Sequence, residues 1–231
     1  MSNSISLLKV SKNFVTNKKI NVLNKISYKF VKGKVYSLVG PSGSGKSTLL
    51  NILSLIDKPS KGNIKIFNKD INYNNISSND MIRASNIGII YQQNNLLTDF
   101  TALENVYLAR LALQNNKNEA LQKAKKLIQK MGLIKRMDHF PSELSGGEMQ
   151  RIAIARALIN EPEIILADEP TGNLDQSAAK NVFKILYGLK NSKRIIIYAT
   201  HNRLFANMAD CKLEMIDGNI KAINAKDKKK I

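Results

Sequence analysis

The sequence has 231 residues, with 36 Lys and Arg against 18 Asp and Glu, which gives a formal net charge of +18. At 43% hydrophobic residues it is too apolar for a disordered basic tail, and its length suits one globular domain with a sizeable core. The single cysteine, Cys211, excludes an intramolecular disulfide framework and a zinc site of several thiolates. Two histidines are too few for a histidine-rich metal centre.

The positive charge leaves open a nucleic-acid partner, an anionic membrane surface or a coding bias. The 29 Lys greatly outnumber the 7 Arg, whereas dedicated polyanion sites favour Arg for bidentate phosphate contacts. We therefore favour the coding bias and expect no specific nucleic-acid partner. No apolar run approaches the roughly 18 residues of a membrane span, and residues 1–15 lack the apolar region of a secretory signal, so we expect neither feature.

The first half of the chain alternates short apolar segments with turns. Alternating apolar residues up to Phe30 predict a small antiparallel sheet. A buried strand is expected at Val35–Val39, followed by a Gly- and Ser-rich turn and by a helix through Leu49–Leu53. Short strands are expected within Asn63–Ile76, and another buried strand at Ile87–Tyr91.

The second half predicts alternating helices and strands. Two helices are expected between Thr101 and Met131, broken at Gln114–Asn118. The later elements are expected as helix Gly147–Ile159, strand Ile164–Ala167, helix Ala178–Leu189, strand Arg194–Ala199 and a short closing β segment. Such alternation implies right-handed βαβ crossovers, and therefore an α/β fold with a mainly parallel sheet.

The strongest motif lies between the strand at Val35–Val39 and the helix that follows it. Its sequence, Gly-Pro-Ser-Gly-Ser-Gly-Lys-Ser over residues 40–47, fits the phosphate-loop pattern GxxxxGK[ST] in the context that this loop requires. Backbone N–H groups and the helix N-terminus would surround phosphate oxygens, Lys46 would reach the β and γ phosphates, and Ser47 would ligate magnesium. The alternative is a merely flexible glycine turn. The predicted nucleotide-binding residues here are Gly40, Pro41, Ser42, Gly43, Ser44, Gly45, Lys46, Ser47 and Thr48.

Two adjacent carboxylates follow the apolar strand Ile164–Ala167. They lie at the strand's C-terminal end, where open parallel sheets hold their ligands. Asp168 is predicted to support magnesium, and Glu169 to orient or deprotonate the water that attacks the γ phosphate. Read alone, Asp-Glu before a proline is equally typical of a solvated helix entry, and the phosphate loop favours the catalytic interpretation.

A second helix start carries Leu-Ser-Gly-Gly-Glu-Met-Gln-Arg over residues 144–151. Ser145 would suffice as an ordinary N-cap, but an N-cap has no need of Gly146 and Gly147, which weaken helix initiation. Ser and two glycines at a helix start can bind an anion. Together with Ser47, this gives one more phosphate-facing helix end than a single nucleotide usually needs, which suggests that two copies pair.

In this order and spacing, the motifs resemble the nucleotide-binding domain of ATP-binding cassette (ABC) transporters, over nearly the whole chain. The resemblance implies a P-loop NTPase core with an N-terminal antiparallel β subdomain and an inserted α-helical subdomain. It also implies a head-to-tail dimer, with ATP and Mg²⁺ sandwiched between Lys46 of one copy and residues 145–147 of the other.

Three further roles come only from this resemblance. Gln92, which has Gln93 beside it, resembles the glutamine that touches magnesium or water and couples to a membrane partner. His201 resembles the histidine that contacts the γ phosphate, with a lone core histidine as the alternative. Phe14 resembles the aromatic residue that stacks on adenine, where Tyr is usual, with a core role as the alternative. The expected catalytic set is then Glu169, His201 and Gln92, and the expected magnesium ligands are Ser47, Gln92 and Asp168.

Subfamily features are weaker. Ala-Asp-Glu-Pro-Thr-Gly-Asn-Leu-Asp over residues 167–175 looks like the ATPases of lipoprotein release and macrolide export, and Met149 departs from their commoner Gln. The resemblance implies a cytoplasmic motor at the inner face of the cell membrane, working with integral membrane permease-like subunits. The alternative is a division-type regulatory ATPase that controls cell-wall hydrolases through a membrane partner.

The resemblance also divides the expected single domain, residues 1–231. A core with the antiparallel subdomain is expected over residues 1–92 and 160–223, a helical insert over 93–159, and a basic tail over 224–231. The lysines of Lys226–Lys230 could help to hold the protein near its membrane.

Overall fold

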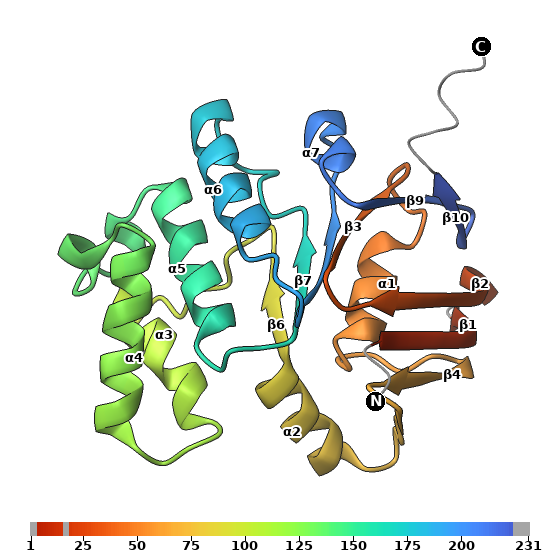
Figure 1. The fold of residues 1–231 in the computed structure, drawn as a ribbon, viewed down its shortest axis with the longest axis horizontal. Helices are drawn as coiled ribbons and strands as arrows, with labels where there is room; N and C mark the ends of the chain where they lie inside the picture. Colours follow the sequence, from red (N-terminus) through yellow and green to blue (C-terminus); the bar gives the residue numbers. More distant parts are fainter. Residues whose placement is uncertain (1–3, 16–18, 224–231) are drawn as a thin grey trace. The chain divides into compact units, whose positions relative to one another are not determined.

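A computed structural model describes residues 4–15 and 19–223, which form two compact units (Figure 1). The first unit comprises the described residues up to Asn79 and from Lys190 onward, and the second comprises Asp80–Leu189. The expected basic tail, with Lys226–Lys230, lies outside the described residues. The expected insert over residues 93–159 stays a prediction.

The first unit contains two sheets. Its elements are β1 (Ser4–Val15), β2 (Lys19–Val31), β3 (Lys34–Val39), α1 (Lys46–Leu53), β4 (Lys61–Ile66), β5 (Lys69–Asp70), β8 (Ile195–Ala199), α7 (Arg203–Asn207), β9 (Cys211–Ile216) and β10 (Asn219–Ile223). One sheet is antiparallel, in the order β2-β1-β4-β5, which confirms the expected antiparallel subdomain. In the other, β3 pairs in parallel with both β8 and β9, and β10 closes an antiparallel hairpin on β9.

An aromatic cluster fills the core of the first unit beside β3. The Phe30 ring lies 4.8 Å from the ring of Tyr28 and 5.0 Å from that of Tyr36, measured between centroids. The Val31 N–H donates a hydrogen bond to the Tyr36 hydroxyl over 2.8 Å, and burial raises the pKa of Tyr36 to about 12. Residues 35–38 of β3 are all buried, which is typical of a strand covered on both faces.

The β1–β2 hairpin is irregular near its tip. Lys12 pairs with Leu23 but the next residue, Asn13, pairs with Asn21, so that Val22 is an extra residue in β2. Such a β-bulge bends its strand and changes the direction of the neighbouring side chains. At this bulge, the Val22 carbonyl oxygen closely approaches Gly45 in the loop between β3 and α1.

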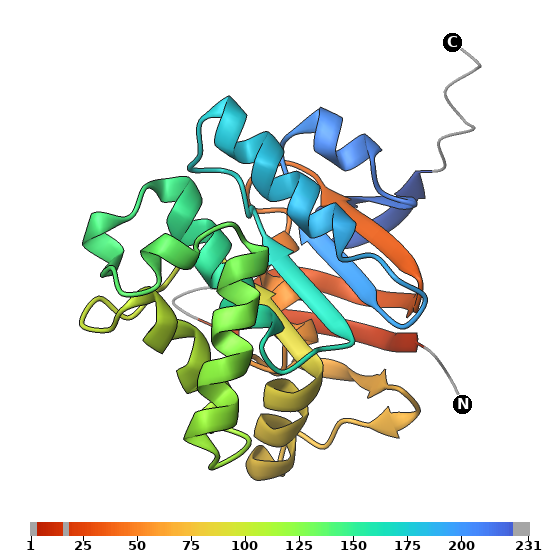
Figure 2. The same ribbon diagram turned by 60° about the vertical axis from the view of Figure 1, so that its left-hand side comes forward.

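The second unit is built on two parallel strands and a set of helices. Its elements are β6 (Ile87–Ile90), α3 (Ala102–Leu111), α4 (Lys117–Lys130), the 3-10 turns η1 (Ile134–Arg136) and η2 (Pro141–Glu143), α5 (Gly146–Leu158), β7 (Ile164–Asp168) and α6 (Gln176–Gly188). The β6–β7 register runs from Ile87 opposite Ile164 to Ile90 opposite Ala167. Figure 2 shows α3, α4 and α5 packed beside one another, and Ala120, Ala124 and Ile128 form the buried stripe of α4.

The structure confirms the α/β architecture and adds two helices that the sequence pattern did not predict. Helix α2 (Ile76–Asn86) leads from the first unit into the second, and α7 has only five residues. Helix α2 buries one side chain, the polar Asn79, whose amide donates to the Asn72 carbonyl over 3.0 Å. A helix without an apolar stripe leaves no 3.6-residue period to detect.

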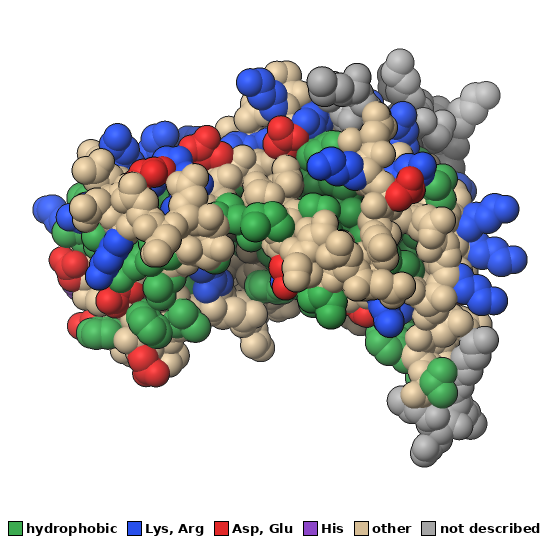
Figure 3. All heavy atoms as spheres, turned by 90° about the horizontal axis from the view of Figure 1, so that it is seen from below, with side chains coloured by type: hydrophobic (Ala, Val, Ile, Leu, Met, Phe, Trp, Pro, Cys, Tyr) green, Lys and Arg blue, Asp and Glu red, His purple; other side chains and the backbone are tan. Residues whose placement is uncertain are grey.

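The excess of basic side chains is visible on the surface. Figure 3 shows Lys and Arg side chains spread over one face among fewer Asp and Glu side chains. Within the described ranges, no helix combines the length and apolar character needed to cross a membrane.

Candidate nucleotide-binding and hydrolysis site

The phosphate loop of the first unit adopts a backbone that requires glycine. Gly40, Gly43 and Gly45 have φ angles of 150°, 79° and 101°, a region that other residues rarely adopt. A Cβ atom at Gly40 would lie 2.2 Å from the Met215 carbonyl oxygen, and one at Gly45 would lie 2.9 Å from the Val22 carbonyl oxygen. The loop is therefore packed between β9 and the bulge of β2, and side chains at these two positions are excluded.

The loop ends at the N-terminus of α1, whose first residue is Lys46. The Lys46 ammonium donates to the carbonyls of Gly40 and Pro41 over 2.9 and 3.0 Å, so it folds back over its own loop. Among the described residues, no side chain caps this helix, so its first N–H groups keep their capacity for an anion. Ser44 is buried, and its hydroxyl has no hydrogen-bond partner within the described part of the chain.

The remaining residues of the loop lie nearer to solvent. Pro41, Ser42, Gly43 and Ser47 are exposed, and Thr48 is half-buried on the first turn of α1. The exposed Ser47 hydroxyl is therefore accessible to a ligand.

Phe14 and His201 lie on other segments of the first unit. Phe14 is 43% exposed near the tip of the β1–β2 hairpin, and the Lys12 ammonium lies over its ring, 4.9 Å from the centroid. Lys12 pairs with Leu23, whose side chain closely approaches Gly45 of the phosphate loop. Because the Phe14 side chain is exposed, the alternative of a core role for Phe14 is not supported.

His201 is exposed just after β8. The preceding Thr200 N–H donates to the Leu38 carbonyl of β3 over 3.1 Å, and the following Asn202 caps α7 by accepting from the N–H groups of Leu204 and Phe205. Thr200 is thereby fixed beside the C-terminal end of β3, and Asn202 at the start of α7. The exposure of His201 between them does not support a core histidine.

The two carboxylates of the second unit lie at the C-terminal end of β7, as the pattern predicted. Asp168 is the last residue of β7, and its Oδ1 atom is buried without a hydrogen-bond partner among the described residues. Glu169 has a φ of 45°, an uncommon conformation for a side-chain-bearing residue, and its carbonyl accepts from the Gly172 N–H over 3.0 Å. This turn fixes the direction in which the Glu169 side chain leaves the strand.

The structure brings Gln92 to the same turn of the second unit. The Gln92 amide Nε2 donates to Asn173 Oδ1 over 2.9 Å. A Cβ atom at Gly172 would lie 2.9 Å from Gln92 Nε2, so the absence of a side chain there permits this approach. Gln92 therefore lies against the segment that directly follows Asp168 and Glu169.

Two side chains of α5 hold the backbone of the loop that carries Gln92. Gln150 Nε2 donates to the Tyr91 carbonyl over 3.2 Å. The Arg156 guanidinium donates to the carbonyls of Asn95 and Asn94 over 2.6 and 2.7 Å, and burial lowers the pKa of Arg156. Neither contact is predicted by the sequence: Gln150 lies within the motif at residues 144–151, whose spacing does not indicate a contact with Tyr91, and Arg156 lies outside the motifs.

The start of α5 is a complete capping box. The Ser145 hydroxyl accepts from the Glu148 N–H over 3.3 Å, and Glu148 Oε2 accepts from the Ser145 N–H over 2.8 Å. This Ser145 N–H, together with the Arg136 side chain 3.2 Å from Oε1, lowers the pKa of Glu148. Ser145 therefore does serve as an N-cap, the simpler of the two roles considered for it.

The two glycines after Ser145 have a packing role of their own. A Cβ atom at Gly147 would lie 3.1 Å from that of Ala178 in α6, and one at Gly146 would lie 3.4 Å from Leu174 Cδ2. They permit the start of α5 to approach the segment after β7.

Each unit thus gathers part of the predicted set. The first contains Phe14, residues 40–48 and His201, and the second contains Gln92, Asp168, Glu169 and residues 145–147. Their roles in binding and catalysis stay predictions.

Comparison with known proteins identifies the family. The family profile described as ABC transporter matches residues 23–172. The lipoprotein-releasing system ATP-binding protein LolD of Rickettsia bellii is 46% identical over 213 residues, which cover 91% of this chain and 94% of that protein. The protein of the same name from Cytophaga hutchinsonii is 42% identical over 215 residues, covering 93% and 98%.

A solved structure shows the same fold. A dimeric ATP-binding cassette in a post-hydrolysis state, bound to ADP and Pi, has a TM-score of 0.88 and 34% identity, and the match covers 95% of this chain and 98% of that one. The P-loop fold and the phosphate loop agree with the family profile and with relatives matched over nearly their full length. The chain therefore belongs to the ABC transporter family and is one of its ATPases.

Proposed function

We propose that this chain is the Mg-ATP-hydrolysing motor subunit of a lipoprotein-releasing ABC transport complex. The observation that carries the ATPase activity is the phosphate loop, with three left-handed glycines and the buried Lys46 at the start of α1. The transport class is supported by the near full-length similarity to proteins named LolD. These relatives do not favour the division-type regulatory alternative.

The phosphate loop supports a simple exchange of hydrogen bonds on binding. On binding, the Lys46 ammonium would exchange its hydrogen bonds to the carbonyls of Gly40 and Pro41 for bonds to the β and γ phosphate oxygens. A rotation of the Lys46 side chain would suffice for this exchange. The N–H groups at the start of α1 would donate to the same phosphates. Phe14 would stack on adenine with its exposed ring face.

The donor set fits a magnesium ion, which prefers oxygen ligands. Ser47 offers an exposed hydroxyl, Gln92 an amide oxygen, and Asp168 a buried carboxylate oxygen without a hydrogen-bond partner among the described residues. We propose that these three residues support the ion, directly or through its water ligands. When bound, it would neutralise charge on the β and γ phosphates.

Glu169 and His201 would act on the reacting groups. Glu169 would orient the attacking water and accept its proton, with its backbone fixed in the left-handed conformation after β7. His201 would donate a hydrogen bond to the γ phosphate from its exposed position after β8. Gln92, held on Asn173, would report on the occupancy of this site to a membrane partner.

We further propose that two copies close head to tail over ATP. Ser145, Gly146 and Gly147 of the second copy would donate to the phosphates from the start of α5, and hydrolysis would reopen the pair. The structure that is similar to this chain is described as dimeric with ADP and Pi. Closure would act on permease-like membrane subunits beside the Gln92 loop, with the motor at the inner face of the membrane.

Glu169→Gln tests the catalytic assignment. Loss of the carboxylate base should lower the steady-state ATPase rate by about 10² or more, whereas ATP binding, measured by nucleotide titration, should persist. Trapped ATP should also raise the dimer fraction in size-exclusion chromatography. Glu161→Gln, at an exposed position before β7, is the matched control and should keep the wild-type rate. Wild-type turnover by Glu169→Gln would refute the assignment.

Reconstitution tests the transport class. The chain and its co-purified membrane subunits, placed in vesicles that carry an acylated lipoprotein, should release that lipoprotein only with Mg-ATP. ATP-dependent activation of a cell-wall hydrolase without lipoprotein release would instead support the division-type alternative.

A further inference from the structure

A buried lysine connects the aromatic ring of Phe14 to the end of the phosphate-loop helix. The Lys12 Nζ atom lies 2.6 Å from Asp57 Oδ1, 2.9 Å from the Lys58 carbonyl oxygen and 4.9 Å from the centroid of the Phe14 ring. Its side chain is only 11% exposed. A buried ammonium needs such polar partners. Asp57 and Lys58 supply them from a segment that lies about 45 residues after Lys12 and Phe14 in the sequence.

Both partner segments are fixed in place. The N–H groups of Ile56 and Asp57 donate to the Asn51 carbonyl in α1, each over 3.1 Å, so the segment of Asp57 is held against the end of the helix that begins with Lys46. Lys12 and Phe14 are two residues apart in β1, and therefore point to the same side of the strand. The ammonium thereby links the ring to the helix.

The β-bulge brings this link close to the phosphate loop. Lys12 pairs with Leu23, and a Cβ atom at Gly45 would lie 2.8 Å from Leu23 Cδ2. The bulged Val22 approaches the same glycine with its carbonyl oxygen. The hairpin that carries Phe14 thus touches the loop that would hold the phosphates.

We propose that Lys12 is a positioning residue for the nucleotide base. This inference rests on the proposed function, in which Phe14 stacks on adenine. The ammonium covers one face of the ring by a cation–π contact and holds the ring in one orientation, while Phe14 stays 43% exposed for the base. A ring ordered in advance loses less side-chain freedom on binding, so Lys12 strengthens the affinity for the base without touching it.

The test compares ATP with inorganic tripolyphosphate, a probe that has no base. Lys12→Met should weaken ATP binding about two- to fivefold, the lower end of the range for a cation–π contact, and leave the affinity for tripolyphosphate unchanged. Lys12→Arg, which keeps a cation over the ring, should restore the ATP affinity. Lys32→Met is the matched control, since Lys32 lies over Phe67 at 4.1 Å in the same unit, and it should bind ATP as the wild type does.

A double-mutant cycle with Phe14→Leu isolates the contact. Phe14→Leu alone should weaken ATP binding, and adding Lys12→Met to it should cause no further loss. Equal losses for ATP and tripolyphosphate, or a Lys12→Met loss that persists without the ring, would overturn the inference. So would unchanged ATP binding by folded Lys12→Met.

Two results separate this inference from the proposed function. If Phe14→Leu weakens ATP binding but Lys12→Met does not, Lys12 has no positioning role and the stacking role stands. If Phe14→Leu has no effect, the stacking role itself is refuted, and the inference with it. Should Lys12→Met fail to fold, Lys12→Gln gives the same readout, because its amide keeps a donor for the Lys58 carbonyl.

Discussion

Replacement of Arg156 by Met should release the loop that carries Gln92. The guanidinium makes two charge-assisted hydrogen bonds of 2.6 and 2.7 Å, to the carbonyls of Asn95 and Asn94. Such bonds contribute about 1.5–3 kcal/mol each, so their gross loss is about 3–6 kcal/mol. Burial of the charge, which lowers the pKa of Arg156, has a desolvation cost that the Met variant avoids.

Water reduces the net effect further. Asn95 is exposed and Asn94 half-buried, so solvent can hydrate their carbonyls in the variant. We therefore expect a net loss of about 2 kcal/mol, which for a chain of this length lowers Tm by roughly 4–8 °C. The ATPase rate should fall as well, because the backbone beside Gln92 loses its anchor.

Thermal unfolding followed by circular dichroism measures the stability term, and a coupled phosphate-release assay measures the rate. Arg156→Lys can replace only part of the fork and should lie between the wild type and Arg156→Met. Arg203→Met, at an exposed position of α7, removes the same charge and should change stability by no more than about 0.5 kcal/mol. A Tm for Arg156→Met within about 1 °C of the wild type would refute the reasoning.

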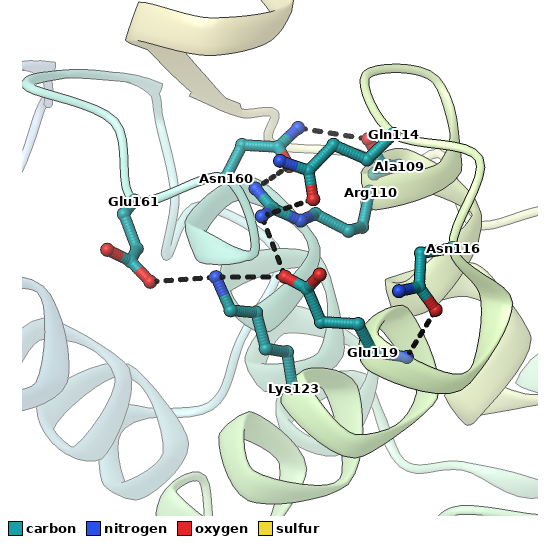
Figure 4. Close-up of polar contacts among 8 residues, drawn as sticks. All are labelled: Ala109, Arg110, Gln114, Asn116, Glu119, Lys123, Asn160 and Glu161. Carbon is teal, nitrogen blue, oxygen red and sulfur yellow. Dashed lines mark hydrogen bonds and ion pairs between the residues drawn. The ribbon is translucent and has the colours of Figure 1, made fainter.

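Three further predictions concern other contacts. Gly172→Ala should lower the ATPase rate about tenfold, because its Cβ would lie 2.9 Å from Gln92 Nε2 and displace it; a wild-type rate in the phosphate-release assay would contradict this. Asn160→Ala should destabilise the protein by about 1–3 kcal/mol in urea unfolding, since its amide donates to the carbonyl of Ala84 and to that of Ala109 (Figure 4). The pKa of Glu148 is lowered in the folded state, so Glu148 contributes stability that is present above its unfolded pKa of about 4.3 and is lost as pH falls through the folded pKa. Glu148→Gln should therefore be less stable by about 0.5–1 kcal/mol at pH 7, and the difference should shrink in unfolding curves as pH falls below about 4.3.

The contacts of Asn160 belong to a polar cluster between α3, α4 and the turn before β7 (Figure 4). Arg110 contacts Glu119 over 3.0 Å, and Lys123 contacts Glu161 over 3.2 Å. Three of these four side chains are partly exposed, so each ion pair contributes little by itself. Asn160 is the member of this cluster that donates to two backbone carbonyls, those of Ala84 and Ala109.

Sequence analysis could predict the elements whose signal is local. The phosphate loop needs left-handed glycines and a lysine within eight residues, so the motif and the conformation coincide. Strands β3, β7 and β8 are apolar runs because both of their faces are buried, and their bounds were predicted to within one residue at most positions. Asp168 and Glu169 follow directly from the end of such a strand.

The remaining features depend on contacts that are distant in sequence. Lys12 meets Asp57 across 45 residues, and Arg156 meets Asn94 across 62, so neither residue belongs to a motif. Helix α2 escaped detection because its Ser- and Asn-rich sequence buries only Asn79. A side chain that positions another one does so through a contact in the tertiary fold, and a short sequence pattern does not predict that contact.

The close packing of Gly40 against β9 limits how far the chain can be truncated. Because Gly40 rests on the Met215 carbonyl, strand β9 forms the floor of the phosphate loop. The stretch that matches the family profile, residues 23–172, contains the whole loop motif, but it does not contain β9, Lys12 or Phe14. A fragment limited to those residues would contain the phosphate-loop motif without the strand against which the loop packs. A truncated variant meant to bind nucleotide should therefore keep the chain from β1 through β10.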